Sequence, residues 1–202
     1  MARKRDEAAF ERKRTQIMRA AEALFIERGF HQTGMAAICD AAGMQPGALY
    51  RYFPSKADLI AALVAEERDE TQAFLARLDG ASDLRSALVE ALMEAVAAVG
   101  EADYGRLALE IAAEGAREER VGALLADAEI GALTHLTRIL EGARAAGQID
   151  KSCDCPVAAA LLLTLIDGAT GSDLHAGFGE RLRPVLRGVV DGILDPSPSP
   201  DV

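Results

Sequence analysis

Residues 33–56 read TGMAAICDAAGMQPGALYRYFPSK and contain two short helical patterns on either side of a glycine. The first pattern repeats apolar residues at a spacing that buries one face of a helix. These residues are Met35, Ile38, Cys39 and Ala42. Gly43 follows and permits a sharp turn. Two short helices joined by such a turn are the layout of a helix-turn-helix that reads DNA.

The second pattern, residues 45–52, predicts a short helix with Pro46 in its first turn, where the missing N–H costs nothing. Leu49 and Phe53 lie four residues apart and give this helix an inward face. The remaining side chains then point elsewhere: Gln45, Pro46, Gly47, Ala48, Tyr50 and Tyr52. Ser55 is expected to cap the next helix, whose first turn presents Lys56.

At these residues the chain resembles the tetracycline-repressor (TetR) family of transcriptional regulators, over Ile17 to about Val64. The matching residues are Leu24-Phe25, Gly29-Phe30, Thr33, Ile38, Ala42-Gly43 and the block from Leu49 to Lys56, LYRYFPSK. The resemblance implies an all-α fold of about nine helices, with a three-helix helix-turn-helix DNA-binding domain at residues 1–55. Residues 56–195 would form a helical ligand-binding and dimerisation domain. Residues 196–202, rich in proline and serine, are expected to be a disordered tail.

Composition and charge agree with this interpretation. Half of the residues are apolar, tryptophan is absent and aromatics make up 4%, which favours a helical core of Ala, Leu, Ile and Val. The net charge is −10, yet residues 1–60 contain ten Lys or Arg and seven Asp or Glu, so this segment carries +3. Basic charge is therefore concentrated where phosphates would bind. The charged first residues and the lack of a long apolar run predict a cytoplasmic protein.

The predicted DNA contacts differ in chemistry. Gln45 carries an amide suited to a base edge or a phosphate. Pro46 and Ala48 offer apolar contact with a thymine methyl group, and Gly47 permits close approach of the backbone. Tyr50 has a hydroxyl on a rigid stem that suits a phosphate, with core packing as its alternative role.

Four further residues complete the predicted DNA-contact set. Tyr52 resembles Tyr50 in its chemistry, and Arg51 would bind a phosphate or pair with an acidic residue. Lys56 adds a positive charge to a helix N-terminus and so favours an anion. Thr33 precedes the first helix of the motif, where its hydroxyl would cap that helix or reach a phosphate.

Other helices are expected at residues 6–28, 56–78, 82–100, 103–116, 126–146, 156–172 and 177–194, with a short turn at 121–125. Residues 158–166, AAALLLTLI, are apolar nearly all round, which indicates burial on more than one side. The last two helices are therefore expected to pair with a second copy of the chain, as the resemblance also implies. Such a homodimer would place two recognition segments ~34–36 Å apart on a palindromic DNA operator.

The resemblance implies a pocket for a small-molecule effector in the C-terminal domain. Polar residues that interrupt apolar helix faces are the candidates: Tyr104, Glu110, Glu114, His135 and Asp167. A solvated face is the alternative for the two glutamates, a satisfied core position for His135, and a capping or dimer-interface role for Asp167. We expect the effector to release a repressor from DNA by shifting the helix at residues 56–78.

Cys153 and Cys155 raise the alternative of a thiol- or metal-responsive regulator, because two thiolates can share a soft metal ion. A third or fourth ligand is not evident nearby, so a loop before the next helix is the other interpretation. A helical enzyme and an adaptor that does not bind DNA are further alternatives. The sequence has no glycine-rich phosphate loop, nucleophile elbow or HExxH motif, so we expect no catalytic residues, no cofactor and no resident metal.

Overall fold

The computed structural model describes residues 2–45, 47–98, 104–170 and 177–196, with the side chains of residues 2–6, 98, 104 and 170 left out. Within these residues the chain is helical and contains no strand, which confirms the predicted all-α class. The α-helices are α1 Ala2–Arg28, α2 Met35–Ala41, α3 Lys56–Leu78, α4 Leu84–Ala98, α5 Tyr104–Gly115, α6 Glu119–Ala145, α7 Cys155–Thr170 and α8 Arg183–Leu194. Two 3₁₀ helices are η1 Leu49–Arg51 and η3 Gly179–Leu182. None of the helices in the described residues is both long enough and apolar enough to cross a membrane.

The chain divides into two compact units. The first comprises Met1–Glu67 and Arg106–Ala126, and the second comprises Arg68–Gly105 and Asp127–Val202. The division falls inside α3, α5 and α6, so residues 56–67 and 106–126 pack with the N-terminal segments. The assignment of residues 1–55 to DNA binding and 56–195 to ligand binding remains a prediction about function.

The first unit has one hydrophobic core that joins α1, α2, η1 and the start of α3. Its largest fully buried side chains include Ile17, Phe25, Ile38, Leu49 and Phe53. α5 and the start of α6 add Ile111 and Val121 to this core. The positions in residues 33–56 that were predicted to face inward are buried, except for Met35, which is half-buried against the same core.

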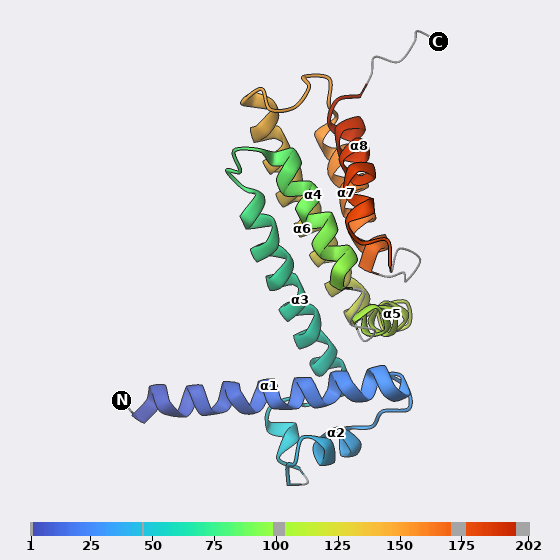
Figure 1. Cartoon of the computed structure of the whole chain (residues 1–202). Coiled ribbons are helices and arrows are strands. Elements are labelled where there is room, and N and C mark those ends of the chain that lie inside the picture. The colour runs from blue at the N-terminus through green and yellow to red at the C-terminus, as the bar shows by residue number, and fades with distance from the viewer. Residues whose placement is uncertain (1, 46, 99–103, 171–176, 197–202) are drawn as a thin grey trace. The chain divides into compact units, whose positions relative to one another are not determined.

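The second unit is a helical bundle in which α4 packs against both α7 and α8, side by side in Figure 1. Leucines dominate its core, among them Leu88, Leu136 and Leu162. Arg85 of α4 binds the carboxylates of Asp191 and Asp195 on and just after α8, at 3.1 and 2.7 Å. These ion pairs tie the end of α8 to α4.

Three helix predictions were wrong in detail. The helix expected at residues 177–194 is the 3₁₀ helix η3, Gly179–Leu182, followed by α8 from Arg183. α6 is continuous over Glu119–Ala145, where a short turn and a separate helix from residue 126 were expected. The Glu118 carboxylate accepts the backbone N–H of Val121 at 2.8 Å and starts the helix early, and no proline interrupts it afterwards. The segment at residues 45–52 is not an α-helix, because Gly47 has a φ of +83°, outside the helical region; only Leu49–Arg51 form a 3₁₀ turn.

Candidate nucleic-acid interface

The turn between α2 and η1 is built by backbone hydrogen bonds and one thiol. Gly43, with a φ of +61°, donates its N–H to Asp40 O, and Met44 donates to Cys39 O, both at 3.0 Å. This is the glycine-ended Schellman arrangement that satisfies the last carbonyls of a helix. The buried Cys39 thiol lies within hydrogen-bonding distance of Met44 O (3.5 Å) and Gln45 O (3.3 Å). The chain therefore leaves this turn in one defined direction.

The segment after the turn presents its polar side chains to solvent. Leu49 and Phe53 are 1% and 2% exposed and anchor the segment in the core, as predicted. Gln45, Gly47, Tyr50 and Arg51 are exposed, whereas Ala48 and Tyr52 are half-buried. Tyr50 is 54% exposed, so its alternative role in core packing is ruled out. Pro46 lies outside the described residues.

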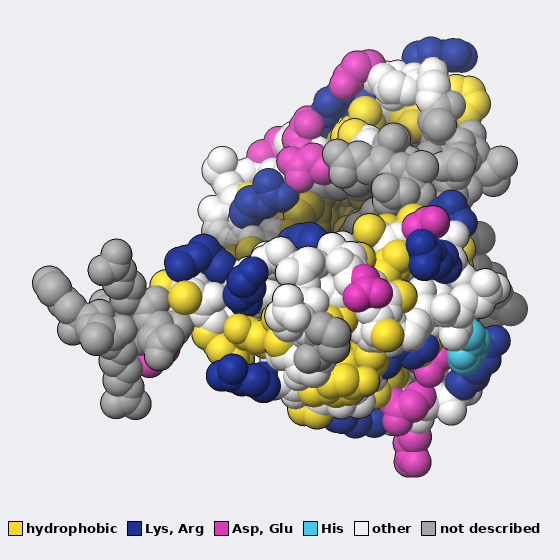
Figure 2. Space-filling view, turned by 90° about the horizontal axis from the view of Figure 1, so that it is seen from below, with side chains coloured by type: hydrophobic (Ala, Val, Ile, Leu, Met, Phe, Trp, Pro, Cys, Tyr) yellow, Lys and Arg dark blue, Asp and Glu magenta, His cyan; other side chains and the backbone are white. Residues whose placement is uncertain are grey.

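Basic side chains surround this segment. Figure 2 shows the face that carries α2 and η1, where hydrophobic side chains lie among Lys and Arg side chains and a smaller number of Asp and Glu side chains. α1 contributes the Arg14 guanidinium, which lies 5.2 Å from the centre of the Phe53 ring. α1 also contributes Phe10, whose ring stacks on Tyr52 with centroids 4.6 Å apart. Phe10 precedes the motif at residues 17–64, so no signal in the sequence marked it as part of this site.

Thr33 is buried and its hydroxyl is occupied. The side chain is 0% exposed, and Oγ1 donates to carbonyl oxygens near the end of α1, Gly29 O at 2.9 Å and Leu24 O at 3.2 Å. The residue before α2 is Gly34, and no side chain caps this helix, so the expected capping role of Thr33 was wrong. Thr33 instead fastens the loop between α1 and α2 onto α1.

Lys56 also points into the first unit. Its Nζ donates to Phe30 O at 2.7 Å and Thr33 O at 3.1 Å, and it lies 4.0 Å from the centre of the Phe30 ring. Burial lowers the pKa of the Lys56 ammonium below its ordinary value, while the Glu114 carboxylate opposes this shift. Two of the three N–H donors of Lys56 are thus committed within the fold.

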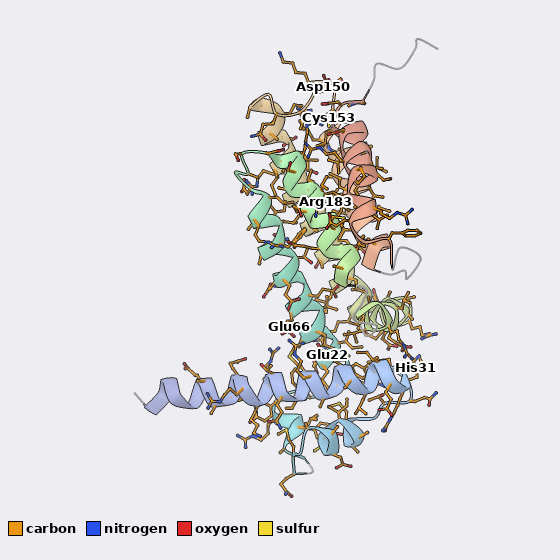
Figure 3. All side chains as sticks on the ribbon, viewed as in Figure 1. Glu22, His31, Glu66, Asp150, Cys153 and Arg183 are labelled. Carbon is orange, nitrogen blue, oxygen red and sulfur yellow. The ribbon has the colours of Figure 1, made fainter. Side chains whose placement is uncertain are left out.

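Two of the predicted effector contacts lie against the same loop. The Glu110 carboxylate of α5 accepts the backbone N–H of Phe30 at 2.7 Å. Glu114 Oε2 is buried without a hydrogen bond, 3.8 Å from Nε2 of His31. Arg117 NH1 approaches that same nitrogen at 2.8 Å, and His31 is labelled in Figure 3. The sequence could not reveal this cluster, because its members come from segments about 80 residues apart.

The other predicted effector contacts are separate. His135 of α6 lies in the second unit with Nδ1 2.6 Å from Oε1 of Gln72 on α3. Asp167 is exposed on α7, and the side chain of Tyr104 lies outside the described residues. Of the described candidates, Glu110 and Glu114 belong to the first unit, and His135 and Asp167 belong to the second. Their contact with an effector remains a prediction.

Each unit has an open depression on its surface. One, of about 350 Å³, is formed by the end of α1 and α5, and the other, of about 340 Å³, by α4 and α8. The first is lined by Ile26, Glu27, Arg28, Gly29, Arg106, Leu109 and Glu110. The second is lined by Ser86, Val89, Glu90, Arg183, Pro184 and Arg187. Glu110 lines the first of these, whereas Glu114, His135 and Asp167 line neither.

Cys153 and Cys155 are buried thiols. They are 1% and 0% exposed, and Cys155 Sγ lies 3.8 Å from Cys153 O (Figure 3 labels Cys153). Burial, together with the neighbouring Cys155, raises the pKa of the Cys153 thiol to about 11. The thiolate, and not the thiol, is the nucleophile and the metal ligand, so the raised pKa of Cys153 works against both roles. In the part of the chain that the structure describes, no three His, Cys, Asp or Glu side chains group as metal ligands would.

α7 and α8 leave apolar side chains on the surface of the second unit. Val157 and Leu161 of α7 are 54% and 50% exposed, and Val185 and Val189 of α8 are 61% and 37% exposed. Each pair is spaced by four residues and lies on one face of its helix. We call these four residues the α7–α8 apolar stripe. Apolar patches of this kind commonly mark protein–protein contacts.

Comparison with known proteins gives consistent matches. Residues 17–63 match the family described as bacterial regulatory proteins, tetR family. The HTH-type transcriptional regulator UidR of Escherichia coli (strain K12) is 30% identical over 88% of this chain and 92% of its own length. The HTH-type transcriptional repressor BepR of Brucella suis biovar 1 (strain 1330) is 27% identical over 89% of this chain and 88% of its own length.

Solved structures share the fold. GusR of Salmonella enterica matches with a TM-score of 0.81 and 32% identity, over 90% of this chain and 95% of that one. FadR of Bacillus subtilis, solved in complex with stearoyl-CoA, has a TM-score of 0.71 and 20% identity, over 89% of this chain and 97% of that one. At that identity, the second match supports the fold alone.

Proposed function

Because this chain belongs to the tetR family of bacterial regulatory proteins and is a DNA-binding transcriptional regulator, we propose that it acts in the cytoplasm as a homodimeric repressor that a small molecule releases from a palindromic operator. One observation carries the proposal. The side chains of Gln45, Tyr50 and Arg51 are exposed on a segment that Leu49 and Phe53 anchor in the core. Rigid support beneath exposed polar groups is what recognition of a fixed duplex requires.

The contacts to DNA divide between base edges and phosphates. Gln45 can donate to and accept from a base edge, so it would contribute to sequence preference. Tyr50 and Arg51 would bind phosphates, which position the protein without reading the sequence. Gly47 and Ala48 would let the backbone approach the duplex closely. Thr33 and Lys56 are absent from this proposed set, because their polar groups are hydrogen-bonded within the fold.

The homodimer would form through the α7–α8 apolar stripe, which would create a four-helix bundle with a second copy. Gly188 and Gly192 are exposed on α8 beside this stripe and would allow close packing of helices. Replacing Leu161 and Val189 with Asp should therefore give a monomer in analytical ultracentrifugation. A stable dimer of that variant would contradict the assignment of this surface.

The effector would bind in the second unit. That unit is a helical bundle with a half-buried polar pair, Gln72 and His135, between α3 and α6. α3 continues from this unit into the first, so a displacement of α3 would reach the residues that support the DNA-binding segment. The effector must bind the DNA-incompetent state more tightly, since otherwise the equilibrium does not move.

DNA binding can be tested by fluorescence anisotropy with duplexes from the chain's own upstream region. Affinity should fall steeply with salt, because phosphate contacts release counterions. Arg51→Ala should weaken binding to all duplexes and lower the salt slope by about two, because each copy in the homodimer loses one phosphate contact. Gln45→Ala should change the preference among operator variants. A dimeric wild-type protein that binds no duplex at low salt would overturn the proposal.

A further inference from the structure

Phe10 is a large aromatic side chain that α1 leaves 42% exposed. Its ring lies on the ring of Tyr52, with centroids 4.6 Å apart and planes inclined by 28°. Stacked aromatic pairs of this geometry attract each other beyond the burial of their surfaces. The contact joins the N-terminal half of α1 to the residue that directly follows η1, and both belong to the first unit.

The contact is part of a larger arrangement along α1. Arg14, one helical turn after Phe10, places its guanidinium 5.2 Å from the centre of the Phe53 ring. One face of α1 thus touches two successive residues after η1, Tyr52 and Phe53. Phe53 is 2% exposed and is fixed by the core, whereas Tyr52 is only half-buried. Phe10 is therefore the aromatic group that can hold the Tyr52 ring from the α1 side.

The hydroxyl of Tyr52 is available for a partner outside the chain. The structure records no hydrogen bond for it within the described residues, whereas the hydroxyl of Thr33 and the ammonium of Lys56 are engaged. A phenol O–H donates well to an anionic oxygen, and its rigid stem leaves only two torsion angles to order. A neighbouring ring that orders these torsion angles in the free protein removes that entropy cost from binding.

We propose that Phe10 is a positioning residue for DNA binding: it holds the Tyr52 ring so that the hydroxyl meets a phosphate of the duplex. This inference rests on the proposed DNA-binding function. Phe10 acts through Tyr52, so its effect depends on the Tyr52 hydroxyl. Because a phosphate carries no sequence information, the effect is the same for operator and non-operator duplexes.

A double-mutant cycle tests this assignment. The variants are Phe10→Ala, Tyr52→Phe and the two combined, measured by anisotropy on an operator duplex and a scrambled duplex. Phe10→Ala should weaken binding about five- to hundredfold on both duplexes, because each of the two copies in the homodimer loses the ordering of one side chain, about two- to tenfold each. Tyr52→Phe should weaken binding at least about hundredfold, because each of the two copies loses a hydrogen bond to a charged group, worth at least about tenfold each. In the Tyr52→Phe background, Phe10→Ala should have less than about a twofold further effect.

Three controls separate positioning from a general structural role. Phe10→Trp, which keeps an aromatic ring, should restore most of the affinity, whereas Phe10→Leu should not. Phe178 in the second unit is 46% exposed and has Arg181 over its ring, so Phe178→Ala is a matched loss of an exposed aromatic side chain. It should leave DNA affinity unchanged. Circular dichroism of each variant should give the wild-type helix content and unfolding midpoint within about 2 °C, as for a surface substitution.

The outcomes are distinct. A Phe10→Ala effect that is absent, or that is equally large with and without the Tyr52 hydroxyl, overturns the assignment of Phe10 while DNA binding by the wild type stands. Full rescue by Phe10→Leu also overturns it, since an aliphatic side chain cannot stack. A wild-type protein that binds neither duplex overturns the proposed function itself, and this inference with it.

Discussion

Replacing Lys56 with Met should destabilise the first unit. The substitution keeps an apolar stem of similar length and removes the ammonium, which donates to Phe30 O at 2.7 Å and Thr33 O at 3.1 Å. Hydrogen bonds that involve a charged group contribute about 1.5–3 kcal/mol, and a cation over an aromatic ring about 0.5–1 kcal/mol. The variant also leaves the buried Glu114 oxygen without its nearby positive charge.

Part of this loss of stability is offset, because the variant no longer has to bury a charged ammonium. The cost of that burial is also what lowers the pKa of Lys56. We expect a net loss of about 2–3 kcal/mol in the free energy of unfolding. For a chain of this size, each kcal/mol corresponds to about 2–4 °C, so the midpoint should fall by about 4–12 °C.

The assay is thermal unfolding followed by circular dichroism, at one protein concentration for all variants because dimer formation makes the midpoint concentration-dependent. Arg51→Met is the matched control: it removes an exposed basic residue from the same face and should leave the midpoint unchanged while weakening DNA binding. If Lys56→Met instead kept the wild-type midpoint and lost DNA affinity as Arg51→Met does, Lys56 would be a phosphate contact and the reasoning would be refuted.

Three further predictions probe other features of the fold. Thr33→Val should lower the free energy of unfolding by about 1–2 kcal/mol in urea unfolding, because the hydrogen bonds of its buried hydroxyl are lost. A variant with the wild-type midpoint and no DNA affinity would contradict this. In α6, a Cβ at Gly122 would lie 2.6 Å from Gly115 O, whereas one at Gly142 meets nothing within 4 Å. Gly122→Ala should therefore lower the free energy of unfolding by about 1–3 kcal/mol, whereas Gly142→Ala should raise it by about 0.5–1 kcal/mol. Equal effects of the two substitutions would contradict the close contact at Gly122. Burial raises the pKa of the Cys153 thiol from 9.0 to about 11, so the folded protein holds this proton more tightly than the unfolded chain does. The protonated thiol therefore contributes to the free energy of unfolding in full below pH 9.0, and this contribution is lost as the pH rises to about 11. Urea unfolding at several pH values should show this loss, and Cys153→Ala should remove that part of the pH dependence.

The sequence determined the features that depend on neighbours along the chain. The spacing of Ile38, Leu49 and Phe53 predicted their burial, and Gly43 predicted the turn that the Schellman bonds form. The helix predicted at residues 56–78 begins and ends as α3 does. These signals are local: helical periodicity, glycine at positive φ and capping residues act within a few positions.

Only the tertiary structure decided how the polar groups are used. Lys56 has the sequence context of an anion site, yet it bonds to carbonyls 23 and 26 residues earlier. Glu110 and Glu114 have the spacing of an exposed helix face, yet they lie against Phe30 and His31. A charged side chain finds its partner through space, and packing of distant helices sets that distance. Periodicity indicates which face of a helix is buried, but it carries no information about which distant group that face will meet.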